Sequence, residues 1–557
     1  MKGKYISKII ILFLFFLFLM CSDSTQKKEK PKLIVSIVID QMRAEYLYRF
    51  QENYSEDGFK LLLREGFNVK NTHYNYIPTA TAPGHSSIYT GATPSEHGII
   101  YNNWFDRKEK KIINCAKDTT VFLVDNLGIS KKDRNNKFQR SPKNLKTTTI
   151  TDELKLFANN RAKVISISIK DRGAIFPGGH LADAAYWYNN NNGHFITSSY
   201  YRKELPIWLK HFNNKKIADS LLNLNWMPLL PKKQYKNSSI DNSSFEKVFK
   251  GRKKSTFPYK LKELRKNNGN YNLLTQIPQG NTLLTELFYA TIKGEKLGKG
   301  NETDFITISF SSTDYIGHNF GIRSKELEDT YVRMDREISK IIKALNREVG
   351  KGKYMLVLTS DHGSSDNPPF LNSNHLPGNF ISSKEIKTKL NKHLSKKISP
   401  KNYISYIDKT QIYLNQKIEN KEKVLKESIV FLKKMEGIKE VFIPEINYSI
   451  ANGNMSIFKN SYNCERSGDI LYQILPGWME KRSFGTTHTT SYNYDTHVPL
   501  IWYGCNIRKG ETALPTKITQ IAPTISILLN IPFPNASNTI PIEGIVGNSS
   551  YSKYAKQ

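Results

Sequence analysis

Five short apolar runs constrain the fold of this chain more than any other feature of its sequence. Each run is six or seven residues long, carries no charged residue and is rich in β-branched or aromatic side chains, as is typical of strands buried on both faces of a parallel sheet. Helical patterns lie between them, for example at Leu327–Leu345 and Ile521–Leu529. The alternation predicts an α/β fold with a doubly wound, mostly parallel sheet flanked by helices. The runs are Leu33–Ile39, Val164–Ile169, Phe305–Phe310, Tyr354–Thr359 and Val498–Tyr503.

Two long stretches differ from these runs in composition, and they divide the predicted core into three parts. Residues 191–285 are rich in Lys, Asn and Ser, and residues 378–480 place Leu425, Ile429 and Leu432 at helical spacing. We interpret both as insertions that form a cap over one end of the sheet. The alternative for the first is a loosely ordered loop. The core segments are then residues 32–190, 286–377 and 481–557.

Residues 1–20 have the pattern of an export signal. Basic residues precede the unbroken apolar run Ile9–Met20, which is too short to span a bilayer. Cys21 follows directly, as the lipidated first residue of a bacterial lipoprotein does, and residues 21–31 would form a tether. Met20 departs from the small residue usual before such a cysteine, so a plain signal peptide is the alternative. We expect an exported protein of a Gram-negative bacterium, either periplasmic or anchored in the outer membrane through Cys21.

The net charge and the cysteine count exclude two broad classes. Lys and Arg number 82 against 50 Asp and Glu, a formal net charge of +32 that could indicate nucleic-acid binding. The excess is mostly Lys scattered among Asn, a compositional habit, and we expect no nucleic-acid partner. Four cysteines in 557 residues exclude a disulfide scaffold. If Cys21 is lipidated, at most one disulfide can form among Cys115, Cys464 and Cys505.

Polar residues follow four of the five apolar runs, at the point where each predicted strand ends. Ligands bind beyond the carboxyl ends of the strands in open α/β sheets. Carboxylate and imidazole are the ligands that zinc takes where thiolates are absent. A single Asp or His at a strand end is usually a helix cap, but four such ends predict a metal site, to which either His488 or His497 could add a ligand. The strand-end residues are Asp40; Lys170, Asp171 and Arg172; Asp314 and His318; and Asp361 and His362.

Thr81 is the candidate nucleophile. It lies in the stretch Pro78–Ser87 (PTATAPGHSS), at the position of a helix N-cap with Pro83 in the first turn. Unpaired N–H groups at a helix N-terminus can bind an anion such as phosphate. The alternative is that Thr81 only caps the helix. We expect a structural role for His85, one turn inside the helix.

In combination, these motifs resemble the alkaline phosphatase superfamily, and most closely its threonine-nucleophile periplasmic alkaline phosphatases. The resemblance runs from about residue 32 to residue 540 and includes the final helical stretch ITQIAPTISILLNIP. Order along the chain and strand-end context both agree with the family. The matching motifs are IVIDQMR, PTATAPGHSSIYTG, ISIKDRGAIFPGG, SSTDYIGH, TSDHG and GTTHTTSYNYDTHVPLIWYG.

The resemblance implies two zinc ions per chain and a phosphoryl-binding set. The first zinc site would use Asp314, His318 and His488. The second would use Asp40, Asp361, His362 and the hydroxyl of Thr81. Asn102, with its neighbour Asn103 as the alternative, would hold the nonbridging phosphoryl oxygens together with Lys170 and Arg172. Because Lys170 supplies positive charge where some relatives use a third metal, we expect no obligatory magnesium.

The predicted function is therefore that of a zinc-dependent alkaline phosphatase. It would hydrolyse small-molecule phosphate monoesters through a covalent phosphothreonine, and we expect a monomer. A phosphodiesterase of the same superfamily is the nearest alternative, although such enzymes typically lack the Lys-x-Arg pair. A sulfatase is disfavoured by the Thr-Ala-Pro-Gly-His motif, and a cofactor-independent phosphomutase by the export signal. An alternative of another class is a surface lipoprotein that binds polyanions without catalysis.

Overall fold

A computed structural model describes residues 29–130, 138–447 and 455–547 of the chain. The predicted signal segment 1–20 and Cys21 lie outside these ranges. Within them, no helix combines the length and the apolar character that crossing a lipid bilayer would require. Cys115 and Cys505 are buried, Cys464 is exposed, and these three described cysteines form no disulfide.

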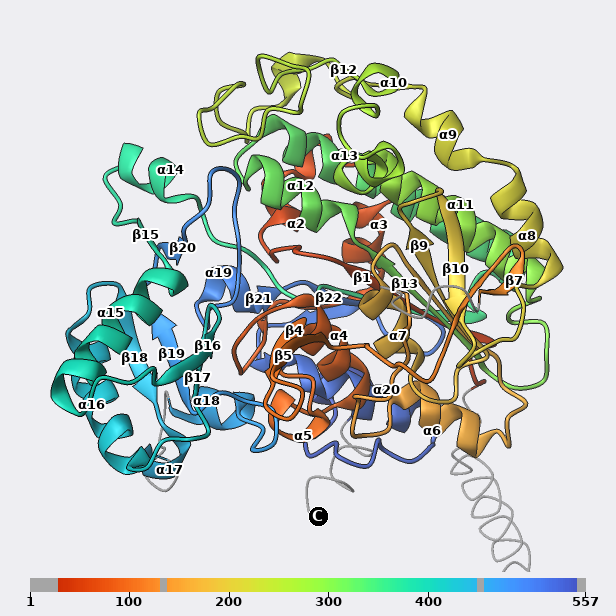
Figure 1. Cartoon of the computed structure of the whole chain (residues 1–557). Helices are drawn as coiled ribbons and strands as arrows, with labels where there is room; N and C mark the ends of the chain where they lie inside the picture. Colours follow the sequence, from red (N-terminus) through yellow and green to blue (C-terminus); the bar gives the residue numbers. More distant parts are fainter. Residues whose placement is uncertain (1–28, 131–137, 448–454, 548–557) are drawn as a thin grey trace, which may run out of the picture. The chain divides into compact units, whose positions relative to one another are not determined.

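The described residues build one large mixed sheet of eleven strands (Figure 1). Four of the five predicted strands occupy its centre in the order β14–β1–β13–β8. From one edge to the other, the strands are β23 (Gly510–Thr512), β2 (Phe67–Val69), β22 (Leu500–Gly504), β14 (Tyr354–Thr359), β1 (Leu33–Ile39), β13 (Asp304–Phe310), β8 (Val164–Ser168), β9 (Ala184–Asn189), β10 (His194–Ser198), β6 (Leu123–Asp125) and β7 (Gly128–Ser130).

The central strands β14, β1, β13, β8 and β9 run parallel to one another. The fifth predicted strand differs from the expectation, because Pro499 separates β21 (His497–Val498) from β22, and β22 pairs antiparallel with β14. Parallel and antiparallel strands that are buried on both faces have the same apolar composition. The sequence pattern therefore did not predict the direction of β22. The α/β sheet architecture itself is confirmed.

Helices cover both faces of the sheet, and the alternation of side chains along β1 shows how. Val35 and Ile37 pack into the core on one face, whereas Ile34 and Val38 pack into the core on the other. The helices that contribute to the first core include α3 (Phe59–Glu65), α8 (Ile207–Asn214), α11 (Gln279–Gly294), α12 (Ser312–Phe320) and α13 (Lys325–Leu345). Those on the other side include α4 (Thr81–Thr90), α6 (Ile150–Phe157), α7 (Asp171–Gly178) and α20 (Ile521–Leu529).

Residues 191–285, interpreted above as an insertion, pack in part against the main sheet and its core. Their first strand, β10, pairs with β9 and so extends the main sheet. Leu209 of α8, Leu222 of α9 (Ile217–Leu222) and Trp226 of β11 (Asn225–Trp226) are buried in the same core as β1. The Lys- and Asn-rich composition of this stretch comes from its solvent-facing positions. These polar residues obscure the sequence pattern of the apolar residues that pack inward.

Residues 378–480 contain a smaller α/β unit with its own apolar core (Figure 1). Its four-stranded sheet has the order β16–β17–β19–β18, and α15 and α16 supply Leu390, Leu394 and Leu425 to the core. The elements are β15 (Asn379–Ile381), α15 (Ser383–Lys397), β16 (Ile404–Ile407), β17 (Gln411–Leu414), α16 (Lys421–Lys434), β18 (Ile438–Phe442), α17 (Pro444–Asn447), α18 (Met455–Ser461), β19 (Ile470–Ile474) and β20 (Trp478–Glu480).

Candidate active site

The predicted strand-end residues meet at one edge of the sheet. Asp40 directly follows β1, Asp314 lies in the helix after β13, and Asp361 lies two residues after β14. These three strands are parallel neighbours in the sheet, so their carboxyl ends lie side by side. Lys170 follows the next strand, β8, and its ammonium contacts both Asp40 and Asp314. Residues far apart in the sequence therefore form one buried polar cluster.

Three atoms in this cluster are buried without a hydrogen-bond partner. They are Asp40 Oδ1, Asp361 Oδ2 and His362 Nε2. His362 Nε2 lies 3.5 Å from the Asp40 atom and 3.7 Å from the Asp361 atom. Leaving such atoms unpaired is costly unless a cation satisfies them. Two carboxylates and one imidazole match the donors that zinc takes, so this group fits a metal site.

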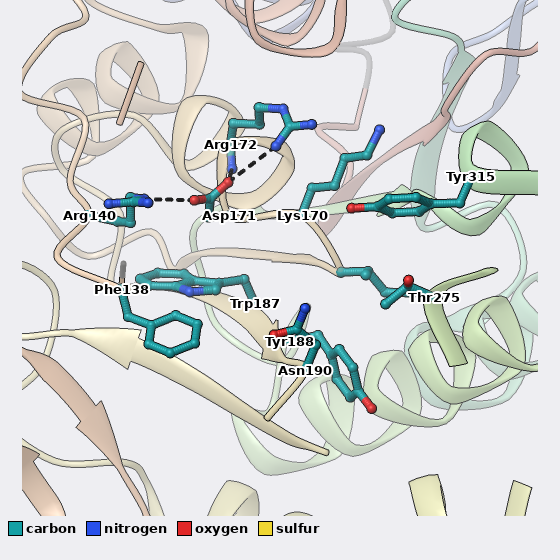
Figure 2. Close-up of a pocket in the computed structure, with 11 residues that line it drawn as sticks. Phe138, Arg140, Lys170, Asp171, Arg172, Trp187, Tyr188, Asn190, Thr275 and Tyr315 are labelled. Carbon is teal, nitrogen blue, oxygen red and sulfur yellow. Dashed lines mark hydrogen bonds and ion pairs between the residues drawn. The ribbon is translucent and has the colours of Figure 1, made fainter. Parts of the chain in front are cut away.

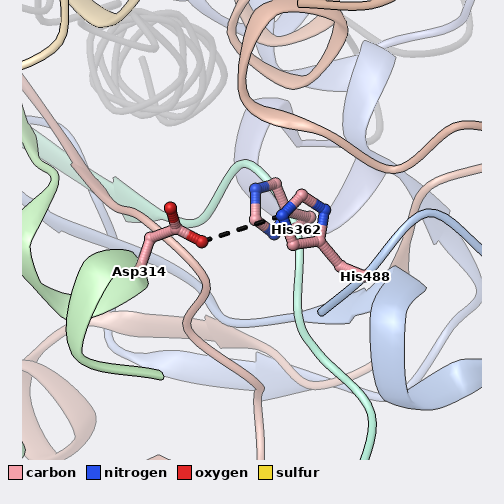
Figure 3. A group of neighbouring side chains, drawn as sticks. All are labelled: Asp314, His362 and His488. Carbon is pink, nitrogen blue, oxygen red and sulfur yellow. Dashed lines mark ion pairs between the residues drawn. The ribbon is translucent and has the colours of Figure 1, made fainter. Parts of the chain in front are cut away.

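A second group of potential metal ligands consists of Asp314, His362 and His488 (Figure 3). The rings of His362 and His488 stack with centroids 3.6 Å apart, and His488 Nε2 lies 3.7 Å from Asp314 Oδ1. His318 Nε2 lies 3.1 Å from the same Asp314 oxygen. The resemblance assigned Asp314, His318 and His488 to one site. In the structure all three lie together, but His362 is close enough to contribute to this group as well.

The three histidines share one orienting contact. The Nδ1–H of each donates to a backbone carbonyl: His318 to Thr486 at 2.7 Å, His488 to Thr79 at 2.6 Å and His362 to Gly363 at 2.9 Å. A hydrogen bond of this kind fixes the tautomer in which Nε2 carries the free lone pair. All three Nε2 atoms lie near a carboxylate of the cluster. Each imidazole is therefore held ready to bind a cation through Nε2.

Thr81 is the first residue of α4, and the N-cap position belongs to Ala80. This corrects the predicted N-cap position of Thr81, which lies one residue further into the helix. Lys170 Nζ donates to the Thr81 hydroxyl at 3.2 Å. A Cβ on Gly84 would lie 2.3 Å from the carbonyl of Asp361, so only glycine lets α4 approach the strand end this closely. His85 bonds Thr81 O and Ser309 Oγ, which suits its expected structural role.

Lys170 is the central charge of the cluster. Its Nζ lies 2.6 Å from Asp40 Oδ2 and 2.7 Å from Asp314 Oδ2, and it is only 4% exposed. Burial alone would lower the pKa of Lys170, but these carboxylates outweigh it and raise the pKa above its usual value. Burial also opposes ionisation of Asp314, yet His318 and Lys170 hold its pKa well below the ordinary range. Burial and the neighbouring Asp361 raise the pKa of Asp40.

Arg172 and Asn102 are the other predicted phosphoryl-binding residues, and Asn102 contacts the N-terminus of α4. Arg172 belongs to the first turn of α7, next to Asp171, and its buried Nε has no hydrogen-bond partner. Asn102 Oδ1 accepts from the N–H of Ala82 at 2.9 Å, which leaves the amide Nδ2 as a donor. Asn103, the alternative considered for this role, is exposed.

A pocket of about 180 Å³ lies beside Lys170 and Arg172 (Figure 2). Lys170 and Arg172 line one side, and the aromatic rings of Trp187, Tyr188 and Tyr315 line others. Tyr315 also packs against the Lys170 ammonium, whose nitrogen lies 5.1 Å from the ring centroid. Aromatic walls around a buried cation exclude water and strengthen its field.

Two polar residues that sequence reasoning missed hold the cluster in place. Gln41 donates from Nε2 to Asp314 Oδ1 at 2.5 Å and from its backbone N–H to Asp361 Oδ1 at 3.2 Å. Arg482 donates to the carbonyls of His318, Phe484 and Thr486. Gln41 could have been suspected because it directly follows Asp40. Arg482 carried no sequence signal, since its partners are backbone carbonyls.

Of the two candidate histidines near the C-terminus, only His488 joins the cluster. His497 lies elsewhere, stacked on His73 with ring centroids 4.6 Å apart and bonded to the carbonyl of Lys70. Asp495 accepts the N–H groups of Thr489 and Thr490 and so fixes the loop that carries His488. Asp495 therefore stabilises the backbone of the loop that carries His488.

The fold agrees with the comparisons with known proteins. The chain belongs to the type I phosphodiesterase / nucleotide pyrophosphatase family, whose sequence profile matches residues 34–498. Its relatives at about 40% identity include named alkaline phosphatases, and the chain is a phosphatase of the alkaline phosphatase superfamily.

Individual relatives match almost the whole chain. A Myroides odoratus protein named calcium-transporting ATPase is 41% identical over 533 residues, covering 93% of this chain and 95% of the relative. Alkaline phosphatase PafA of Elizabethkingia meningoseptica is 39% identical over 543 residues, covering 94% and 96%. A crystal structure of wild-type PafA superimposes with a TM-score of 0.88 at 38% identity, covering 93% of this chain and 99% of that one.

Proposed function

We propose that this phosphatase is a zinc-dependent alkaline phosphatase that hydrolyses phosphate monoesters through a phosphothreonine at Thr81. The observation that carries the proposal is the set of buried, unpaired donor atoms on Asp40, Asp361 and His362, beside a threonine hydroxyl at a helix N-terminus. The names of the relatives support a phosphatase acting on small phosphate esters. The metal, the intermediate and the preference for monoesters are the steps that this proposal adds.

Two groups of side chains would hold two zinc ions. One group comprises Asp40, Asp361 and His362, with the Thr81 hydroxyl nearby, and the other comprises Asp314, His318 and His488. Their oxygen and imidazole donors suit zinc, and Lys170 occupies the space between Asp40 and Asp314. When bound, zinc supplies positive charge that lowers the pKa of a coordinated hydroxyl or water. The Lys170 charge is the reason that we expect no obligatory magnesium.

The nucleophilic step uses Thr81. The Thr81 hydroxyl oxygen attacks phosphorus and the P–O bond to the alcohol portion breaks. The proton that Thr81 loses ends on the departing oxygen, which leaves as the alcohol. The Lys170 ammonium, which already donates to this hydroxyl, stabilises the developing alkoxide. Water then attacks the phosphothreonine, which releases phosphate and restores the hydroxyl.

Three donors would recognise the phosphoryl group. Lys170 donates to Thr81 and Asn102 accepts from Ala82, both at the N-terminus of α4, and Arg172 lies two residues after Lys170. A monoester dianion presents three nonbridging oxygens. A diester has only two, together with a second bulky group. Preorganised donors offset the charge that develops on these oxygens at little reorganisation cost. The set therefore favours monoesters over diesters.

We further propose that the enzyme is exported, with residues 1–20 as its signal and Cys21 as a lipid anchor, and that it acts as a monomer. The unit of residues 378–480 would serve as a cap beside the catalytic edge of the sheet. Its separate apolar core supports its treatment as an insertion in the main fold.

The deciding experiment measures turnover of an aryl phosphate monoester and of an aryl phosphate diester at alkaline pH. We expect much faster monoester hydrolysis, loss of activity after chelation and recovery when zinc is added. Faster diester turnover would instead favour a phosphodiesterase, the alternative that the family description supports. Polyanion binding that survives chelation, without turnover of either ester, would favour the non-catalytic lipoprotein.

A further inference from the structure

Lys409 brings a positive charge from the 378–480 unit to the candidate active site. It lies in the turn between β16 and β17, and its Nζ donates to the Thr487 hydroxyl at 3.0 Å. Thr487 directly precedes His488, whose imidazole belongs to the second group of potential metal ligands. The inserted unit therefore reaches the catalytic edge of the sheet through a cationic side chain.

No carboxylate within the described ranges forms an ion pair with Lys409. Burial and the neighbouring Arg482 lower the pKa of Lys409, and the carboxylates that oppose this shift are those of Glu480, Asp314 and Asp408. Each has other partners: Glu480 accepts from Ser383, Asp314 is paired with Lys170, and Asp408 accepts the N–H groups of the following turn. Lys409 thus carries a charge that no neighbouring carboxylate neutralises directly.

The same unit also contacts the segment that follows Asn102. Phe105 of β4 (Asn103–Asp106) stacks on Tyr406 of β16 with ring centroids 5.7 Å apart. The inserted unit therefore touches the core at two places, through Tyr406 beside the Asn102 segment and through Lys409 at Thr487.

We propose that Lys409 is a specificity-determining residue that binds an anionic group on the alcohol portion of the substrate. This inference rests on the proposed phosphatase function. The core residues Lys170, Arg172 and Asn102 already serve the phosphoryl oxygens, whereas Lys409 comes from the inserted unit and lies beside His488. The preferred substrates of the enzyme are then small phosphate monoesters whose alcohol portion carries a second anion, either a carboxylate or another phosphate.

The test compares two matched pairs of substrates. In each pair, only one member carries the additional anion: phenyl phosphate against 4-carboxyphenyl phosphate, and glycerol 3-phosphate against 3-phosphoglycerate. The measured quantity is the ratio of kcat/KM for the doubly anionic member to that for its partner. In Lys409→Met this ratio should fall about tenfold, the size expected for loss of one charge-assisted hydrogen bond. Lys409→Arg, which keeps the charge, should retain most of the ratio.

Two further measurements separate this inference from the proposed function. Thr487→Val keeps the Lys409 charge while removing its hydroxyl partner, and should lower the ratio less than Lys409→Met does. Binding of the glycerol pair to the Thr81→Ala protein, followed by calorimetry, gives the same ratio without turnover. Metal content and melting temperature of each variant establish that the fold is retained.

The possible results divide clearly. Equal losses on both members of a pair, or an unchanged ratio in both turnover and binding, would overturn the role of Lys409. Absence of monoester turnover in the unsubstituted protein would overturn the proposed function, and the binding ratio would still decide the role of Lys409.

Discussion

Glu246 provides a quantitative test of how burial acts in this structure. It lies in the 191–285 stretch, where it is 5% exposed. Its Oε2 accepts from Ser243 N at 3.1 Å and from Ser255 Oγ at 2.7 Å, whereas Oε1 is buried without a hydrogen-bond partner. Burial raises the pKa of this carboxyl from 4.5 to about 7. Glu326, whose pKa burial and Glu246 raise, lies close to it.

The sign of the effect on stability follows from the raised pKa. Below the unfolded-state pKa of 4.5, both states hold the proton and stability is unaffected. As the pH rises toward the folded-state pKa of about 7, the unfolded chain releases its proton first, and stability is lost. Each pKa unit corresponds to about 1.4 kcal/mol, so the loss approaches about 3 kcal/mol above pH 7.

The perturbation is Glu246→Gln, since the amide oxygen can still accept from Ser243 and Ser255 without a charge. We expect the variant to be more stable than the parent by about 3 kcal/mol at pH 9 and nearly equal to it at pH 4.5. Thermal unfolding at a fixed scan rate at both pH values, with holoenzyme in each case, measures the difference. Glu263→Gln, at an exposed position, is the matched control and should change little at either pH. A Glu246→Gln variant with the parent's pH dependence would refute the reasoning.

The remaining predictions concern the active site. Thr81→Ala should lower monoester turnover by about a thousandfold or more and abolish the acid-stable phosphoenzyme; labelled phosphothreonine trapped in that variant would identify another nucleophile. Replacing both Lys170 and Arg172 with Ala should reduce kcat/KM by at least about a hundredfold for an aryl monoester but much less for a diester, whereas equal losses would show that they do not discriminate. Elemental analysis should find about two zinc ions per chain, and full activity in metal-free protein would contradict the mechanism. Arg482→Lys should weaken metal retention about tenfold on dialysis, because lysine cannot bridge the carbonyls around His318; unchanged retention would assign Arg482 no positioning role.

The sequence predicted the centre of the sheet better than its periphery. The runs Leu33–Ile39 and Tyr354–Thr359 coincide with β1 and β14, because strands buried on both faces leave an uninterrupted apolar signal. Short edge strands such as β23 and β7 gave no such signal, since they are only three residues long. The apolar pattern also could not predict the direction of β22, because strand direction depends on pairing rather than on composition.

The candidate site, too, was predicted only in part from the sequence. Asp40, Asp314 and Asp361 could be predicted because the ends of neighbouring parallel strands meet at one edge of a sheet. The contacts of Lys170 with Asp40 and Asp314 could not, since they depend on where a long side chain points. Gln41 and Lys409 escaped notice because a polar residue beside a strand or in a turn is ordinarily solvated. Their roles depend on tertiary contacts alone.

The order of the donor groups along the chain has a consequence for biogenesis. They extend from Asp40, just after the first strand, to His488, which follows β20 (Trp478–Glu480). A nascent polypeptide still growing on the ribosome lacks this last imidazole until most of its length has been synthesised. Before then it holds at most one complete set of donors, so the two ions of the proposed mechanism could both be acquired only late, in the finished fold.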